Sequence, residues 1–163
     1  MQQTSKNSEP NNSRTKLLNY TVWLLARRNY HSHELANRLR ERKNATEAQI
    51  SEILQKLANL KYIDDEYFLQ IFIRDQLARK PQGARMIKQR LFQKKIFDDR
   101  IDRVLEAEYG NECDYAEKAL LKKVKPGQKK DYQKIYRFLC SRGFKYETIK
   151  EVLAKHGFTK LSV

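Results

Sequence analysis

The chain has 163 residues, and its 34 Lys and Arg against 20 Asp and Glu give a formal net charge of +14. Such an excess indicates a polyanion or an acidic protein surface as the partner, and a well-solvated protein that simply uses many lysines is the alternative. The N-terminus lacks an apolar signal-peptide core, and no run approaches the roughly eighteen apolar residues of a membrane helix, so we expect a cytoplasmic protein without membrane contact.

Helix signals follow one another along most of the chain. Residues 1–15 contain no large aliphatic residue after Met1, so we expect a disordered polar tail. From there on, the sequence predicts three domains at 16–63, 64–111 and 112–163. The predicted helices are 17–30, 32–43 and 46–61 in the first domain, 64–79, 83–95 and 98–109 in the second, and 113–124, 130–142 and 145–156 in the third.

One apolar pattern recurs in all three domains. Two apolar residues four positions apart are followed, after ten or eleven positions, by three more at i, i+3 and i+4, the spacing of one helix face. The copies are Leu35, Leu39, Ile50, Ile53 and Leu54; Ile87, Leu91, Ile101, Val104 and Leu105; and Ile135, Leu139, Ile149, Val152 and Leu153. A period near 50 residues with helical spacing is typical of helical repeat proteins. The sequence therefore predicts an all-α fold, an elongated array of three tandem three-helix repeats, as a monomer.

Polar residues at the predicted helix starts are read as caps. Thr46 and Gln49 form a capping box, and acidic pairs begin at Asp64 and Asp98, where the helix dipole favours carboxylates. Turns are predicted around Pro81 and Pro126. Since the chain also lacks a Gly-rich phosphate loop, a nucleophile elbow and a plausible Ser/His/Asp order, we expect that it is not an enzyme.

Cysteine and histidine are sparse. Cys113 and Cys140 are too few and too widely separated for a disulfide framework or a zinc site. His31, His33 and His156 have no partners at ligand spacing. We therefore expect neither a metal ion nor a cofactor.

Basic residues recur at equivalent helix positions when the three repeats are aligned. The aligned pairs are Arg38 with Arg42, Arg90 with Lys94, and Arg142, whose preceding partner is Phe138. A second stripe and a cluster near the third-repeat turn add Arg85, Lys88 and Lys95, and then Lys122, Lys123, Lys125, Lys129 and Lys130. Such flanks could line up as a basic track for a protein or DNA partner, or they could be solvated faces whose stems cover apolar surface.

Aromatic residues are plentiful, with nine Tyr, seven Phe and Trp23. A row of exposed aromatics between basic residues would indicate base stacking. Most aromatics here have core spacing, and Tyr30, Tyr62, Tyr67 and Phe92 have no clear place. The pattern therefore favours the core over stacking on bases.

Four segments in order resemble one known family. They are 24–35 (LLARRNYHSHEL), 60–68 (LKYIDDEYF), 85–96 (RMIKQRLFQKKI), and 136–144 (YRFLCSRGF) followed by 149–153 (IKEVL). Together they are similar to RecX, the bacterial regulator of the RecA recombinase. The family often places Gly after the second helix of a repeat, which only Gly143 keeps. Asn44 can adopt the left-handed conformation there, but Lys95 does so poorly, so we expect a different turn in the second repeat.

The resemblance implies a function. It implies a protein that lies in the groove of the RecA–DNA filament, bridges RecA protomers, and restrains strand exchange, ATP turnover and coprotease activity, hence a role in recombination, DNA repair and the SOS response. It also implies that the basic surface can bind DNA directly. Two other classes stay open: a nucleic-acid-binding protein, either sequence-independent or a helix-turn-helix regulator, and a scaffold for another acidic protein.

Overall fold

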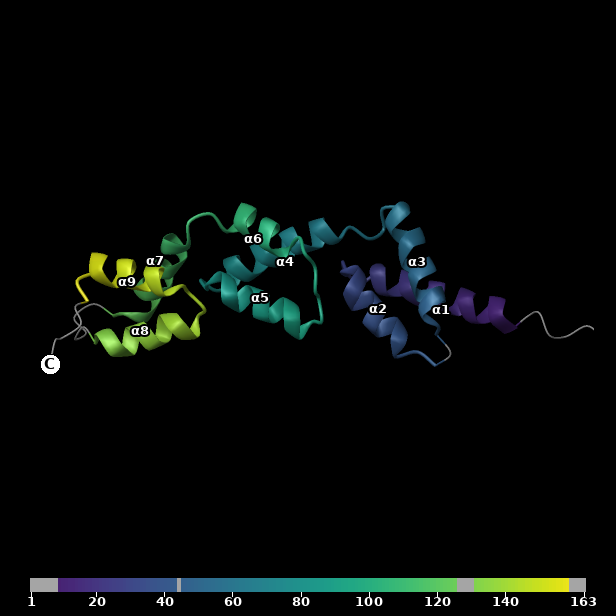
Figure 1. The fold of residues 1–163 in the computed structure, drawn as a ribbon, viewed down its shortest axis with the longest axis horizontal. Coiled ribbons are helices and arrows are strands. Elements are labelled where there is room, and N and C mark those ends of the chain that lie inside the picture. The colour runs from purple at the N-terminus through teal and green to yellow at the C-terminus, as the bar shows by residue number, and fades with distance from the viewer. Residues whose placement is uncertain (1–8, 44, 126–130, 159–163) are drawn as a thin grey trace, which may run out of the picture. The chain divides into compact units, whose positions relative to one another are not determined.

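A computed structural model describes residues 9–43, 45–125 and 131–158 of the chain (Figure 1). Within these ranges the chain forms nine α-helices and no strand, which confirms the all-α prediction. The helices are α1 (Glu9–Leu25), α2 (Ser32–Arg40), α3 (Glu47–Asn59), α4 (Asp65–Arg79), α5 (Ala84–Gln93), α6 (Ile101–Tyr109), α7 (Glu112–Lys123), α8 (Tyr132–Ser141) and α9 (Tyr146–Lys155). None of the described helices has the combined length and apolar character that crossing a bilayer requires.

The fold divides into two compact units. Unit 1 holds the chain through Leu69 together with Lys94–Phe97, and unit 2 holds Gln70–Gln93 together with the chain from Asp98 onward. Helix α4 therefore begins in unit 1 and continues into unit 2. The predicted division into three repeats stays a prediction.

Helix α1 begins earlier than expected. Residues 9–15, predicted to belong to a disordered tail, are helical, whereas residues 1–8 lie outside the described ranges. Two physical reasons account for the extension. Proline is tolerated in the first turn of a helix, where its missing N–H costs nothing. The side chain of Arg14 also forms an ion pair with Glu52 on α3, which gives this polar segment a partner that periodicity does not reveal.

Unit 1 is built on the core shared by α1, α2 and α3. Helix α2 packs against both of its neighbours. The predicted apolar pattern is buried here, because Leu35, Leu39, Ile50 and Ile53 are all at most 3% exposed. The core is completed by Leu17, Leu24, Leu57 and Ile63, with Leu54 packed at its edge. The predicted capping box of Thr46 and Gln49 is present at the start of α3.

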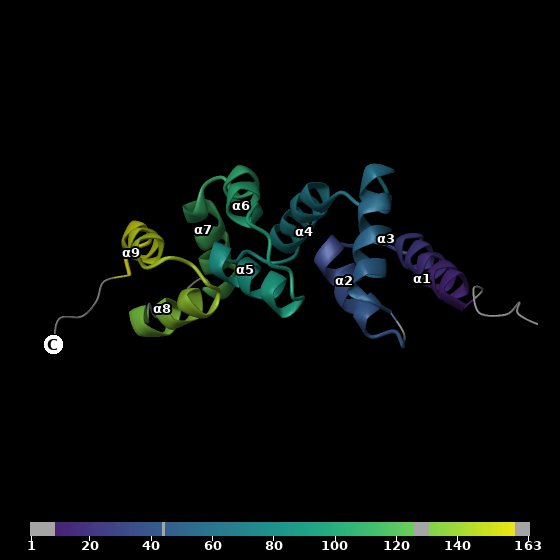
Figure 2. The same cartoon turned by 45° about the vertical axis from the view of Figure 1, so that its right-hand side comes forward.

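Unit 2 repeats the same arrangement. Helices α7, α8 and α9 pack pairwise, and both views show them grouped together (Figures 1 and 2). Their core contains Ala116, Ala119, Leu120, Phe144 and the third copy of the apolar pattern, from Ile135 to Leu153. Helix α5 packs on α6, and the second copy, from Ile87 to Leu105, is buried as well. The recurring stripes are therefore core in both units.

Two glycines hold the turn before α5 against the turn after α8, within unit 2. The backbone N–H of Gly83 donates to the carbonyl oxygen of Arg142 over 2.8 Å. A Cβ at Gly83 would lie 2.0 Å from the carbonyl oxygen of Gly143, and Gly143 itself has a φ of +80°. A larger residue at Gly83 would force these backbones apart. Glycine at 143 thus has a contact role in addition to ending α8.

The turn after α5 corrects one expectation. Lys95 adopts the left-handed conformation, with a φ of 57°, so the prediction that this turn would depart from the usual geometry is wrong. The strain is offset by local contacts within unit 1. The side chain of Lys94 pairs with Glu34 over 3.3 Å, and the N–H of Phe97 donates to His33 Nδ1 over 3.2 Å. Asn44 lies outside the described residues.

Glu34 is the most buried carboxylate among the described residues of unit 1, at 9% exposure. Its carboxylate accepts from Arg28 over 2.7 Å as well as from Lys94. Burial alone would raise the pKa of Glu34, but the hydrogen bond from Arg28 and the charge of Lys94 outweigh burial and lower the pKa. Its ionised form therefore stabilises unit 1.

Replacing Glu34 with Gln should lower the free energy of unfolding of unit 1 by about 1–2 kcal/mol at neutral pH, because Arg28 and Lys94 lose a charged acceptor. The folded-state pKa of Glu34 is depressed, so this stabilisation is present above the unfolded pKa and is lost as pH falls through the folded value. The parent should therefore lose more stability than Glu34→Gln below about pH 5. Urea denaturation followed by the fluorescence of Trp23, the single tryptophan, measures this.

Glu47→Gln is the matched control. Glu47 also pairs with an arginine, Arg40, over 2.8 Å, but both side chains are exposed, so its loss should leave stability unchanged. Equal stability of the two variants at neutral pH would contradict the role assigned to Glu34.

Candidate anion-binding surfaces

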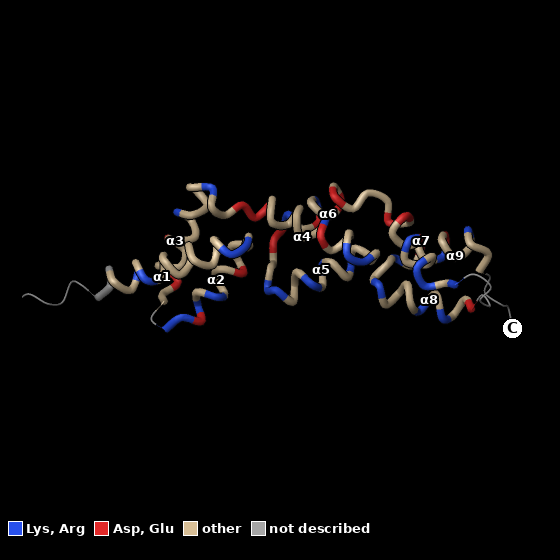
Figure 3. Tube along the Cα trace, turned by 180° about the vertical axis from the view of Figure 1, so that it is seen from behind, with Lys and Arg blue, Asp and Glu red and all other residues tan. Residues whose placement is uncertain are grey.

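Lys and Arg recur along α2, α5, α7 and α8, as the blue segments of Figure 3 show. Each unit gathers some of these side chains around a concave surface. The two surfaces differ in chemistry.

The surface in unit 2 lies where α4, α7 and α8 end. A groove of about 310 Å³ is lined by Arg79, Lys80, Pro81, Ala119, Lys122, Lys123, Phe138 and Arg142, and we name it the α4–α7–α8 groove. Five of these eight residues are cationic and none is acidic. The sequence places them there for a local reason, because basic side chains stabilise the last turn of a helix.

The groove keeps a net positive charge after the nearby negative charges are counted. Arg79 pairs with Asp75 over 2.9 Å, and each of the three helix ends adds about half a negative charge. The remaining net charge is about +2 to +3. Lys123 and Arg142 lie over the ring of Phe138, at 5.4 and 5.1 Å from its centroid. The groove thus offers an electropositive, partly aromatic surface to an anion.

Only part of the predicted basic set lies in this groove. Lys122, Lys123 and Arg142 do, whereas Lys129 and Lys130 lie outside the described residues. Arg79 and Lys80 line the groove too, and sequence reasoning did not select them. Their position at the end of a helix, just before the turn at Pro81 and Gly83, is a sequence signal for exposed basic residues. Their proximity to α7 and α8 comes from the tertiary fold.

The predicted stripe on α5 is largely occupied by contacts within unit 2. Lys88 forms an ion pair with Asp102, and the guanidinium of Arg90 donates to the side-chain oxygen of Gln76. Arg85 is exposed on the same helix. Lys94 and Lys95 belong to unit 1 instead, where Lys94 pairs with Glu34 and Lys95 is exposed.

The surface in unit 1 combines arginines with aromatic rings. A groove of about 680 Å³ is lined by Tyr20, Trp23, Leu24, Arg27, Arg28, Tyr30, Arg38 and Arg42, and we name it the α1–α2 groove. Arg38 and Arg42, predicted as one basic pair, each lie against a ring. The guanidinium carbons lie 5.8 Å from the centroid of Tyr30 and 3.7 Å from that of Tyr20, respectively.

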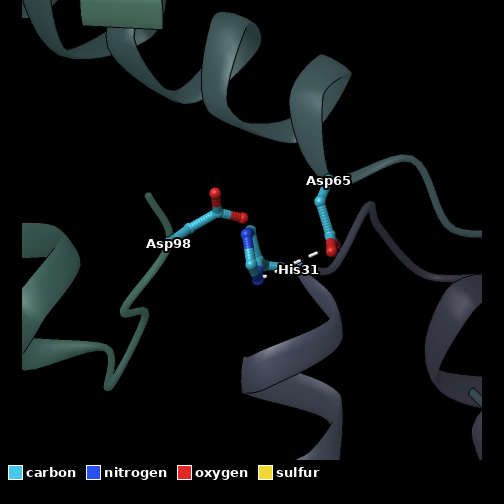
Figure 4. Close-up of side chains that lie close together, drawn as sticks. All are labelled: His31, Asp65 and Asp98. Carbon is cyan, nitrogen blue, oxygen red and sulfur yellow. Dashed lines mark ion pairs between the residues drawn. The ribbon is translucent and has the colours of Figure 1, made fainter. Parts of the chain in front are cut away.

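The acidic residues that begin α4 have structural roles. Asp64 accepts the N–H of Tyr67 over 2.9 Å, as a helix cap does. Asp65 accepts both the N–H and the hydroxyl of Ser32 over 2.7 Å, and its carboxylate points toward the buried ring of His31 (Figure 4). His31 Nδ1 lies 3.7 Å from Asp65 and also caps α2 by accepting the N–H of His33. These contacts tie the start of α4 to the start of α2.

Comparisons with known proteins agree with the helical pattern. Residues 64–105 match the second three-helix domain of RecX, and residues 112–153 match the third. Regulatory protein RecX of Chlorobium phaeobacteroides (strain BS1) is 31% identical over 140 residues, which cover 85% of this chain and 91% of that protein. Regulatory protein RecX of Chlorobaculum tepidum is 34% identical over 148 residues, covering 86% and 88%.

A solved structure gives the same fold. The crystal structure of RecX from Lactobacillus salivarius aligns with a TM-score of 0.76 at 23% identity, covering 88% of this chain and 96% of that chain. The fold and the sequence relatives point to one family, and this chain belongs to the RecX family of regulatory proteins.

Proposed function

We propose that this protein regulates the RecA recombinase, mainly by restraining it, and that it does so by binding in the groove of the RecA–DNA filament. Membership of the RecX family supports the regulatory role. In this proposal the protein acts in the cytoplasm as a monomer and lowers the strand-exchange, ATPase and coprotease activities of RecA.

The α4–α7–α8 groove is the observation that carries the proposal. Five of its lining residues are cationic and none is acidic, so the groove complements an acidic protein surface or a row of phosphates. Lys122 and Lys123 are exposed, so a partner can reach both, and Lys123 also lies over the ring of Phe138. The filament offers both kinds of anion.

The aligned basic pairs differ in how far they are available to a partner. Arg142 contributes through the α4–α7–α8 groove, and Arg38 and Arg42, both exposed residues, contribute through the α1–α2 groove. Reversing Arg90 or Lys94 would disturb the contacts with Gln76 and Glu34, so a loss of function there would be ambiguous. Lys122 and Lys123 are the cleaner test.

Replacing Lys122 and Lys123 together with Glu should raise the concentration needed for half-inhibition of RecA about tenfold or more, because like charge then meets an anionic partner. The assay is DNA-dependent ATP hydrolysis by RecA, with helicity of the variant checked by circular dichroism. A folded double variant that inhibits as well as the parent would contradict the proposed contact.

Lys134→Glu with Lys150→Glu is the matched control. Both lysines are exposed on unit 2 and neither lines the groove, so the control carries the same change in net charge. It should inhibit RecA within about twofold of the parent, since exposed charges away from a contact contribute little. Equal loss in both double variants would show that only net charge matters.

Direct nucleic-acid binding that is nearly independent of sequence is the second candidate function. The observation that favours it is again the α4–α7–α8 groove, because Phe138 lies among its cations and offers a ring beside phosphate contacts. This activity could accompany filament binding, or it could be the protein's main role.

The salt dependence of binding tests this second function. With about five phosphate contacts on a single strand, the slope of log affinity against log salt should be about −3.5, so affinity falls about a hundredfold from 50 to 200 mM. Lys122→Gln with Lys123→Gln should reduce the slope to about −2.1. A slope near zero would exclude phosphate contacts, and strong preference for one duplex sequence would favour a helix-turn-helix reader. Fluorescence anisotropy of a labelled oligonucleotide measures both.

A further inference from the structure

We propose that the α1–α2 groove of unit 1 is a stacking site for unpaired nucleobases, so that unit 1 binds single-stranded nucleic acid through bases as well as phosphates. The site shares no residue with the α4–α7–α8 groove, and the inference does not depend on RecA.

The aromatic part of the site is built on one face of α1. Tyr20 and Trp23 are three positions apart, and their rings stack with centroids 5.9 Å apart and planes inclined by 19°. Trp23 is 52% exposed, although burying such a ring would stabilise the fold. Trp23 therefore keeps about half of its surface in water, which a base could cover.

The cationic part of the site consists of arginines whose guanidinium groups lie over the same rings. Arg27 lies 4.4 Å from the centroid of Trp23, and Arg42 lies 3.7 Å from that of Tyr20. Arg27, Arg38 and Arg42 each lie over an aromatic ring, and none of them forms an ion pair with a carboxylate of the described residues. Arg28 differs, because it pairs with Glu34. Three guanidinium groups thus keep their N–H donors for phosphate oxygens.

The two parts together select a single strand. A polyanion without exposed bases, such as an acidic peptide, would use the arginines but would leave Trp23 in water. In a duplex the base faces are already stacked on one another, so they are not available to a protein ring. A single strand presents both unpaired bases and phosphates, and the groove offers both aromatic rings and guanidinium groups to them.

The size of the groove is consistent with this ligand. Its volume of about 680 Å³ exceeds the space that a single ion needs, and no acidic side chain lines it. The less specific alternative is that the arginines simply lie on aromatic rings and cover them from solvent. The alternative predicts no difference between a strand with bases and one without.

Trp23 is the only tryptophan, so its fluorescence reports directly on the proposed site. The full chain is titrated with an oligothymidylate of about ten nucleotides and with an abasic strand of the same length, which carries the phosphates alone. Oligothymidylate should quench Trp23 and bind about tenfold more tightly than the abasic strand. Equal affinities, or preference for a duplex of that length, would overturn the proposal.

Substitutions locate the effect. Trp23→Ala should weaken binding of labelled oligothymidylate about tenfold and leave binding of the abasic strand unchanged, whereas Trp23→Phe, which keeps a ring, should stay close to the parent. Tyr146→Ala is the matched control, because Tyr146 is 55% exposed on unit 2 and lies outside the site. It should change neither affinity. A folded Trp23→Ala variant with unchanged preference for bases would overturn the proposal.

The salt dependence of binding tests the phosphate contacts of the arginines separately. Arg27→Gln with Arg42→Gln should weaken binding of both strands and reduce the salt slope by about 1.4, since each arginine accounts for about one phosphate contact. An unchanged slope would contradict the phosphate role. None of these assays contains RecA, so their failure would leave the proposed regulation of RecA untouched, and the reverse also holds.

Discussion

Burial of one short apolar stripe per helix is the constraint on which the rest of this structure depends. Helices α2, α5, α6, α8 and α9 have only nine or ten residues each, too short to be stable alone in water. Each persists because its stripe packs against neighbours, as Leu35 and Leu39 of α2 do in unit 1 and Ile135 and Leu139 of α8 do in unit 2. Many exposed positions outside the stripes can therefore carry charge without disturbing the core.

Short helices also bring many helix ends to the surface, and those ends explain the electrostatics. Basic residues in a last turn interact favourably with the helix dipole, and α2, α3, α4, α5, α7 and α9 each carry at least one there. Where three such ends converge, at Arg79, Lys123 and Arg142, a structural preference becomes a positively charged groove. The same packing that makes the fold thus creates a surface suited to anions.

Local pattern was sufficient to predict the helices, and insufficient to predict which side chains meet. Periodicity identified Ile87 and Ile149 as core, and spacing identified the cap at Thr46, because both are properties of neighbouring turns. Lys95 was misjudged, since the contacts that offset its left-handed backbone come from residues more than sixty positions away in sequence. Residues 9–15 were misjudged because Arg14 finds Glu52 only after folding.

The candidate surfaces show the same limit. The recurrence of Arg38 and Arg42 is visible in the sequence, but their cation–π contacts with Tyr30 and Tyr20 are not. The sequence favours a core role for most aromatics, but Trp23 is 52% exposed. Tyr30, which has no clear place in the sequence, is buried at 7% exposure. Arg79 and Lys80 line the α4–α7–α8 groove because the turn at Gly83 contacts Arg142, and the local pattern predicts the turn but not this contact.

Hydrogen–deuterium exchange of the chain, alone and bound to RecA filaments on single-stranded DNA, shows whether the α4–α7–α8 groove contacts the filament. We expect slower exchange in peptides covering residues 79–83, 119–125 and 138–143 when filaments are present, and less change with the same DNA alone. Binding to filaments that protects other segments and leaves these three unchanged would contradict this expectation, and so would an absence of any binding.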